Sequence, residues 1–188
     1  MKKTLFLSFI GLTSLASAQS VKFGVKAGVN FATETASISG VSITSDTYTS
    51  FHFGAIADIG LQNFSIQPGV LFSVKGSSST NSSGTSLTYI EVPVNLLYHI
   101  PAGPGKVFFG AGPYLGYGIS ASNGVSFGST TDKVANPDFG LNLLGGYRLN
   151  SGLLFSAGYG LGLANLINNG NGATLKNRVT SISIGYFF

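Results

Sequence analysis

Few residues in this chain could do chemistry, and their types exclude several classes of site. The 188-residue sequence has no cysteine, which excludes thiolate catalysis, disulfides and every cysteine-ligated metal or cofactor. His52 and His99 are the two histidines, and neither stands in a metal-ligand spacing. We therefore expect no metal and no cofactor.

One serine and one histidine keep an enzyme interpretation open. Residues 124–128 read GVSFG, but the G-x-S-x-G motif needs a strand, a sharp turn and a helix around its serine. Ser126 instead falls in an expected outer loop of an all-β chain, so we interpret the match as chance. His52 beside an acid is the remaining candidate for a lipid hydrolase, because His99 falls near the opposite end of the expected fold. We predict that the protein is not an enzyme.

Hydrophobic residues alternate with small or polar ones along much of the chain. In VKFGVKAGVNF (residues 21–31), every second residue is apolar, which predicts a strand with one apolar face. The same alternation occurs in eight segments in all: 21–31, 51–61, 64–74, 90–98, 107–117, 139–149, 153–163 and 182–188.

The connections between these segments alternate in length. Three are short and have turn compositions, at 62–63, 101–105 and 150–152. Four are long and polar, at 33–47, 77–86, 121–136 and 165–177, and the composition of SSSTNSSGTS and NNGNG is typical of exposed, mobile loops. This arrangement predicts an up-and-down meander with both ends on the side of the short turns.

The low charge indicates which face of the strands points outward. Charged residues make up 9% of the sequence, whereas soluble domains average about 25%. A soluble barrel of lipocalin type would show water a surface of glycine, serine and asparagine, which is unusual. We therefore predict an eight-stranded antiparallel up-and-down transmembrane β-barrel in the outer membrane, with its apolar side chains in lipid.

The first 18 residues have the composition of a targeting segment. Lys2 and Lys3 precede a short apolar run that ends in ASA, which is the pattern of a cleaved signal peptide. We expect residues 19–188 to form one barrel domain. Removal of the two lysines lowers the formal charge from +4 to +2, and the absence of any Lys/Arg cluster argues against a nucleic-acid partner.

Eight charged residues share the non-apolar face of the strands. In a narrow barrel interior such groups must pair or carry a large desolvation cost. They would form either a plug of ion pairs or the lining of an anion-favouring pore; we favour the plug, because eight strands leave space only for side chains. The predicted polar network of the lumen is Lys22, Lys26, Asp58, Lys75, Glu91, Lys106, Asp138 and Arg148.

Three motifs resemble those of a known family. QPG at Gln67, EVP at Glu91 and GAGPY at Gly110 are similar to the strand motifs of the PorT-type outer-membrane β-barrel family. The resemblance covers the sequence after the signal peptide and implies an eight-stranded barrel; the family's founding member has a role in protein secretion. His99 departs from the family pattern, which commonly has a basic residue there.

The C-terminal residues point to a further expected partner, the machinery that inserts barrels into the outer membrane. Alternating apolar residues that end on Tyr186 and Phe188 resemble the signal read by the barrel assembly machinery, and an aromatic there suits the membrane interface. We predict a structural or accessory envelope protein that contacts outer-membrane lipid, and the resemblance adds an envelope or secretion protein as partner. The alternatives are a narrow solute channel and the lipid hydrolase.

Overall fold

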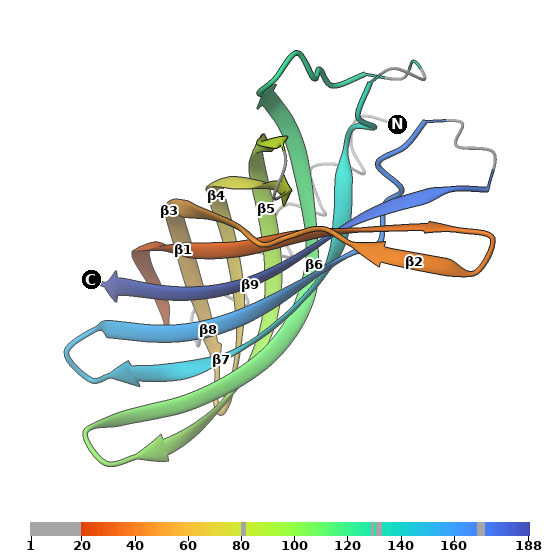
Figure 1. Cartoon of the computed structure of the whole chain (residues 1–188). Coiled ribbons are helices and arrows are strands. Elements are labelled where there is room, and N and C mark those ends of the chain that lie inside the picture. Colours follow the sequence, from red (N-terminus) through yellow and green to blue (C-terminus); the bar gives the residue numbers. More distant parts are fainter. Residues whose placement is uncertain (1–19, 80–81, 129, 131–132, 169–171) are drawn as a thin grey trace, which may run out of the picture.

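The computed structural model describes residues 20–79, 82–128, 130, 133–168 and 172–188, and these form antiparallel strands (Figure 1). The predicted signal peptide lies outside the described residues. The strands are β1 (Val21–Ile38), β2 (Val41–Thr44), β3 (Tyr48–Leu61), β4 (Phe64–Ser79), β5 (Ser82–Ala102), β6 (Gly105–Ala121), β7 (Asp138–Leu149), β8 (Leu153–Gly162) and β9 (Thr174–Phe187). The part of the chain that is described contains no helix long and apolar enough to cross a membrane.

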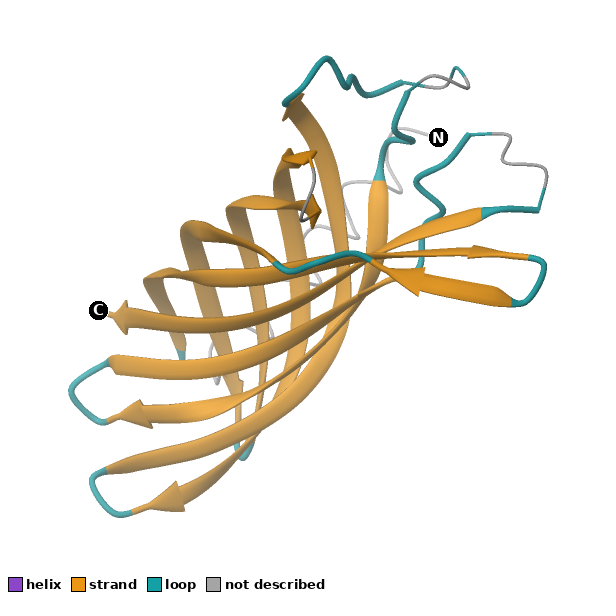
Figure 2. Ribbon diagram, viewed as in Figure 1, coloured by secondary structure: helices purple, strands orange, loops and turns teal. Residues whose placement is uncertain are grey.

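The wall of the molecule is a closed barrel of eight strands. Each strand from β3 to β9 pairs with the next along the chain, β1 pairs with β3, and β1 also pairs with β9 from Gly24 opposite Phe187 to Ser37 opposite Thr174. Closure leaves the wall without a free edge, which a sheet in hydrocarbon requires. The predicted fold class is confirmed, and β2 is an additional short strand outside the wall (Figure 2).

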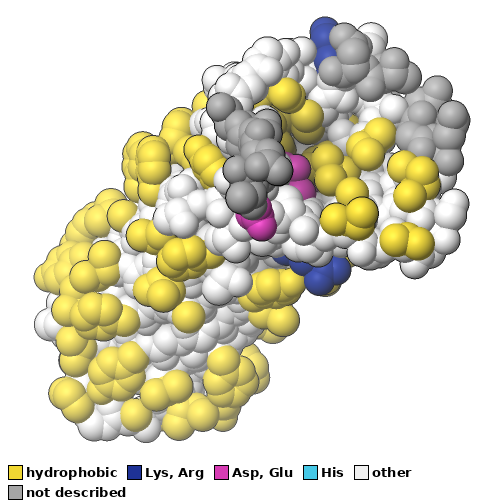
Figure 3. Space-filling view, viewed as in Figure 1, with side chains coloured by type: hydrophobic (Ala, Val, Ile, Leu, Met, Phe, Trp, Pro, Cys, Tyr) yellow, Lys and Arg dark blue, Asp and Glu magenta, His cyan; other side chains and the backbone are white. Residues whose placement is uncertain are grey.

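The apolar face of the strands points outward, as predicted. Phe23 and Leu143 are 62% and 59% exposed, whereas Asp58 and Lys75 on the opposite face are buried. Apolar atoms cover much of the visible wall in Figure 3. Rings on neighbouring strands pack side by side there, such as Phe53 on Phe72 with centroids 5.2 Å apart. The soluble-barrel alternative is wrong, because it places these side chains in the interior.

The short turns lie where the sequence predicts them. Gln62, Gly103 and Gly152 take positive φ values of 57°, 54° and 98°, as tight connections require. The C-terminal end of β9 lies on the same side of the barrel as these turns, opposite the longer connections (Figure 1). Short turns mark the periplasmic side of outer-membrane barrels, so the longer connections point out of the cell.

Two of the four predicted long loops are largely strand, which corrects the sequence interpretation. Residues 33–47 continue β1 to Ile38 and form β2, joined by Ser39 and Gly40 with φ of 50° and 84°, the signature of a type I′ hairpin. Most of residues 77–86 likewise extend β4 and β5. Serine and threonine make these segments look like polar loops in the sequence, but they do not interrupt the backbone pairing of the strands. The Ser37 and Ser42 hydroxyls are hydrogen-bonded across the hairpin at 2.7 Å.

The other two long connections pack on each other above the barrel. Val134 bridges to both Phe127 and Ile167. The side-chain nitrogen of Asn168 lies 2.9–3.0 Å from the carbonyl oxygens of Gly128, Thr130 and Lys133. Leu166 is 1% exposed and its carbonyl accepts from the Ala135 amide over 2.9 Å, so the described parts of these two connections form one cap.

Candidate functional site

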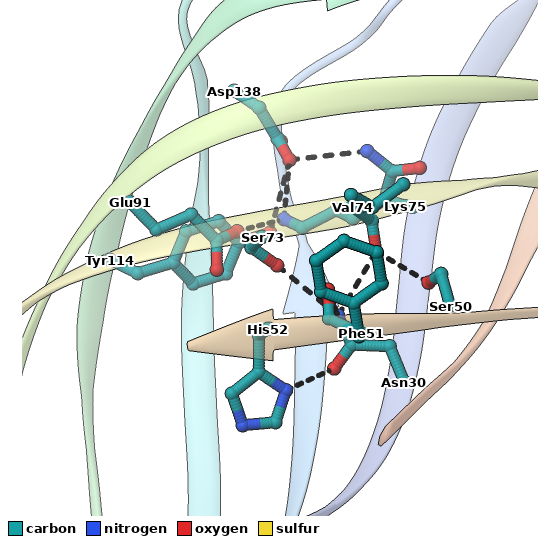
Figure 4. Close-up of polar contacts among 11 residues, drawn as sticks. Asn30, Ser50, Phe51, His52, Ser73, Val74, Lys75, Glu91, Tyr114 and Asp138 are labelled. Carbon is teal, nitrogen blue, oxygen red and sulfur yellow. Dashed lines mark hydrogen bonds and ion pairs between the residues drawn. The ribbon is translucent and has the colours of Figure 1, made fainter. Parts of the chain in front are cut away.

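The outer half of the lumen holds a lysine between two carboxylates (Figure 4). Lys75 on β4 forms an ion pair with Glu91 on β5 and donates to Asp138 Oδ2, at the start of β7, over 3.1 Å. Lys75 and Asp138 are 3% and 0% exposed. This enclosure strengthens the attraction between the charges and makes each of them costly to leave alone.

Aromatic and amide groups complete the surroundings of Lys75. Its ammonium lies 4.4 Å from the ring centre of Tyr114 and 5.1 Å from that of Tyr89, within the range of cation–π attraction. The Tyr114 hydroxyl and the Asn177 amide donate to Asp138 Oδ2 over 3.4 and 3.2 Å. The contacts therefore tie β4, β5, β6, β7 and β9 together across the lumen.

A second ion pair lies at the periplasmic end. Arg148 on β7 pairs with Asp58 on β3, and its guanidinium lies 5.1 Å from the ring centre of Phe187. Asp58 is buried, and Arg148 is partly buried at 12% exposed. It connects opposite walls close to the short turns.

Between the two charged clusters the lumen contains an apolar layer, which the sequence did not predict, beside buried polar residues such as Gln67 and Asn95. On β7 the inward residues run from Arg148 through Leu144 to Asn142 and Asp138, so Leu144 separates the two ends. It packs against a buried cluster from six other positions: Ile56, Leu71, Leu97, Phe108, Leu154 and Phe187. The expectation of a lumen closed by polar side chains is wrong in this layer, because large apolar residues among the inward glycines escaped the alternation pattern.

The predicted polar network divides into pairs and unpaired lysines. Five of its eight members form the two ion clusters described above. Lys22 and Lys106 lie at the periplasmic rim, and Lys26 lies deeper in the lumen. Within the described residues none of these three makes an ion pair or a side-chain hydrogen bond.

A serine, a histidine and an asparagine form a relay that the sequence analysis missed. Asn30 donates to the carbonyl of Val74 over 3.0 Å, which turns its side-chain oxygen toward His52 Nδ1 at 2.7 Å. That oxygen can only accept, so Nδ1 carries the proton and Nε2 accepts from the Ser183 hydroxyl over 3.0 Å. This is the order of groups in a serine-nucleophile relay.

A glycine makes the relay possible. Gly28 on β1 stands opposite both His52 on β3 and Ser183 on β9. A Cβ there would lie 2.7 Å from the imidazole Cε1, so the missing side chain lets the ring reach across β1. Parity places all three relay residues inside the barrel, but only the cross-strand register brings them together.

The space beside the relay is small. A cavity of about 70 Å³ is lined by residues that include Lys26, Asn30, His52, Lys75 and Asn142, but not Ser183. This volume holds a few water molecules and no lipid ester. The hydroxyl of Ser183 is buried behind the imidazole, so the relay is built like a structural hydrogen-bond network.

The remaining candidates of the sequence analysis lie elsewhere. His99 Nε2 and the Ser65 hydroxyl are hydrogen-bonded at 2.7 Å. This contact lies at the periplasmic end, far along the barrel from His52. Ser126 lies in the outer connection, as predicted, where its carbonyl accepts from the Val134 amide. Among the described residues no three His, Asp or Glu side chains are grouped as metal ligands would be.

Side chains also close the outer mouth. The ring of Phe127 lies 5.3 Å from that of Tyr89 in an edge-on contact. Gly118 provides the room, because a Cβ on it would meet the Phe127 ring, and the Asn136 amide bonds both backbone groups of Gly118. The lumen is thus obstructed at its mouth, at Lys75 and at the apolar layer.

Comparison with known proteins agrees with this architecture. A family model described as outer membrane protein beta-barrel domain matches residues 17–168. The chain belongs to this family. Among curated proteins none matches the chain.

One solved structure shares the fold of this outer membrane protein beta-barrel domain, and others resemble it more distantly. Neisserial surface protein A (NspA) is 18% identical, with 90% of this chain and 99% of that chain covered and a TM-score of 0.55. Ail, the attachment invasion locus protein of Yersinia pestis, is 12% identical over 89% and 98% of the two chains, with a TM-score of 0.48. The likeness to NspA shows a common fold.

Membership of the outer membrane protein beta-barrel domain family places the chain in the outer membrane. The apolar wall is then the lipid-facing surface, and the short turns face the periplasm. The outer cap and the β1–β2 hairpin stand on the external side.

Proposed function

We propose that this protein is a non-enzymatic accessory barrel that binds a protein partner through its outer end. The observation that carries the proposal is the apolar face of the β1–β2 hairpin. Ile38, Val41 and Ile43 are 57%, 63% and 71% exposed, and they lie beyond the part of β1 that carries the lipid-facing aromatics. Exposed apolar groups outside the bilayer favour a protein contact.

The hairpin also offers a backbone edge. Among the described strands β2 pairs with β1 alone, so its other edge is free to accept a strand from a partner. Serine and threonine occupy one face of the hairpin, where Thr35 bonds Thr44 at 3.2 Å. The apolar residues occupy the other face, which gives the partner a single side to contact.

The obstructed lumen supports a role that needs no transport. Three levels of side chains fill the barrel, and the cavity between them has about 70 Å³. A narrow solute channel is therefore the less favoured alternative. Purified protein in planar bilayers is expected to give no single-channel current, and a reproducible conductance would contradict this part of the proposal.

The narrower role in protein secretion rests on the PorT-like motifs at Gln67, Glu91 and Gly110. We propose it as one form of the accessory function. Deletion of the gene would then reduce secretion of envelope cargo without changing the permeability of the outer membrane. Unchanged secretion would leave the accessory role with another partner.

The test of the main proposal is cross-linking in native outer membranes. Tagged wild-type protein is expected to capture a stoichiometric envelope protein, and a V41S/I43S variant is expected to lose it. The matched control is S42A on the opposite face of the same strand. Recovery of the barrel alone from wild-type membranes, or equal capture by V41S/I43S, would overturn the proposal.

The lipid hydrolase remains a second candidate, favoured by the Ser183–His52–Asn30 relay. Its test is release of fatty acid from phospholipid vesicles by reconstituted protein. We expect no turnover above that of S183A and H52A variants, because the cavity has no room for an ester beside Ser183. Turnover that both substitutions abolish would instead establish the enzyme.

A further inference from the structure

Charge on the lipid-facing wall is confined to one place. Of the charged residues in the described strands, Lys22, Lys26, Glu34, Asp58, Lys75, Glu91, Lys106, Asp138 and Arg148 are on the inward parity. Lys176 and Arg178 on β9 are on the outward parity. Their direction is fixed by Asn177 between them, which donates to Asp138 inside the lumen, since successive side chains alternate between the two faces.

The pair lies at the outer edge of the apolar belt. In the row of Thr180, the flanking outward residues are Phe31 on β1 and Tyr159 on β8. One step further out, Arg178 stands between Thr33 and Leu161.

The next step outward is more polar. Lys176 stands opposite Thr35, which is hydrogen-bonded to Thr44. The belt therefore changes within two steps from aromatic side chains to two cations beside hydroxyl groups. Figure 3 shows dark-blue Lys and Arg atoms on the outer wall where the yellow belt meets the projecting end.

Within the described residues neither cation has an acidic partner. The Cα atoms of Lys176 and Arg178 are about 7 Å apart, because the residues are two positions apart in one strand. Both side chains can therefore reach one anion. An arginine fork binds two phosphate oxygens, and a lysine adds a point charge.

We propose that Lys176 and Arg178, with the hydroxyls of Thr33 and Thr35, bind the phosphate of an outer-leaflet lipid headgroup. Their depth selects this ligand, because the headgroup layer begins where the apolar belt ends. Lysine and arginine side chains that only extend toward water could lie anywhere around the barrel. These two instead lie on the same face of one strand. The site is independent of the hairpin face in the proposed function.

The test measures lipid binding by native mass spectrometry of the whole protein folded in detergent. The probes are diphosphoryl lipid A and the same lipid without phosphate. Removing one basic residue near a membrane surface costs about fivefold in affinity. We therefore expect K176Q/R178Q to bind the phosphorylated probe about 25-fold more weakly than wild type, with little change for the dephosphorylated probe.

The matched control is K133Q, which removes a lysine from the outer cap and leaves β9 intact; its affinity should equal that of wild type. If the double variant does not fold, K176Q and R178Q singly should each show the fivefold loss. Equal binding of both probes by wild type would overturn the site. Full displacement of the lipid by millimolar inorganic phosphate would assign the residues to a soluble anion and overturn the lipid as ligand.

Discussion

Two lysines project into the same lumen and have opposite surroundings. Lys75 contacts two carboxylates and two tyrosine rings. Lys26 lines the same cavity, but no acid or hydrogen-bond acceptor is paired with it in the described part of the chain. In the wall it stands between Gly54 and Gly185, so its immediate neighbours offer space and no partner.

The difference shows that burial alone does not assign a structural role to a charge. Around Lys75 each charge compensates another, and removal of one exposes the others to the low-dielectric interior. Around Lys26 no described ion pair or hydrogen bond would be broken, although Glu91 and His52 line the same cavity. Substitutions of Lys75 and of Lys26 should therefore change the free energy of unfolding by amounts that differ in sign as well as in size.

The largest effect is expected from Lys75→Met. The change leaves Glu91 and Asp138 as two buried carboxylates without a cation, which should lower the free energy of unfolding by about 3–5 kcal/mol. The sequence has no tryptophan, so unfolding by urea in lipid vesicles is best followed by far-UV circular dichroism.

The triple variant K75M/E91Q/D138N is the control for this prediction. It removes all three charges and should recover most of the lost stability, because neutral residues of similar volume replace buried ion pairs at little cost. A triple variant no more stable than Lys75→Met would show that packing, and not charge, accounts for the loss.

A smaller effect is expected from Arg148→Met at the periplasmic end. Asp58 would lose its partner, but the rim admits water to this pair more readily, so the expected loss is about 2 kcal/mol. Raising the salt concentration should reduce the difference from wild type here and leave that of Lys75→Met unchanged. The same salt response at both sites would contradict the distinction between rim and interior.

Alternation was sufficient to predict the barrel. The period of two along segments such as residues 21–31 identified the strands, and the low charge identified the outward face. The hairpin at Ser39 and Gly40 was missed because its strands are built from serine, threonine and alanine as well as isoleucine and valine. Ala36, Ile38, Val41 and Ile43 do alternate with serine and threonine, but each arm of the hairpin has only two apolar positions, too few to distinguish a short strand from a polar loop.

The lumen was less predictable because its contacts depend on register. Parity correctly placed Lys75, Glu91 and Asp138 on the inward face, but their meeting depends on the stagger between β4, β5 and β7. The same holds for His52, which reaches Ser183 across 131 positions. Sequence distance carries no information on such pairs, so the relay was beyond a pattern argument.

On the Lys26 side, Gly28→Ala should disturb the relay. The added Cβ would overlap the carbonyl oxygen of Ile182 and lie 2.7 Å from the imidazole Cε1 of His52, so the neighbouring strand must shift and the ring must move away from Ser183. Loss of a buried hydrogen bond and local strain together should cost about 1–2 kcal/mol.

Gly146→Ala is the matched control, since its Cβ would overlap the carbonyl oxygen of Phe155 and lie 2.7 Å from the Phe108 ring without touching the relay; equal losses would remove the relay from the explanation.

The smallest effect, and one of opposite sign, is expected from Lys26→Met. The substitution keeps the length of the side chain and removes a charge that has no described partner, so stability should be unchanged or rise by up to about 1 kcal/mol. Lys106→Met at the rim serves as the control and should have no measurable effect, because its ammonium can reach water. A loss above about 1 kcal/mol for Lys26→Met would mean that its charge is compensated in the folded barrel. Both lysines would then have an acidic partner, and they would differ only in the distance to it.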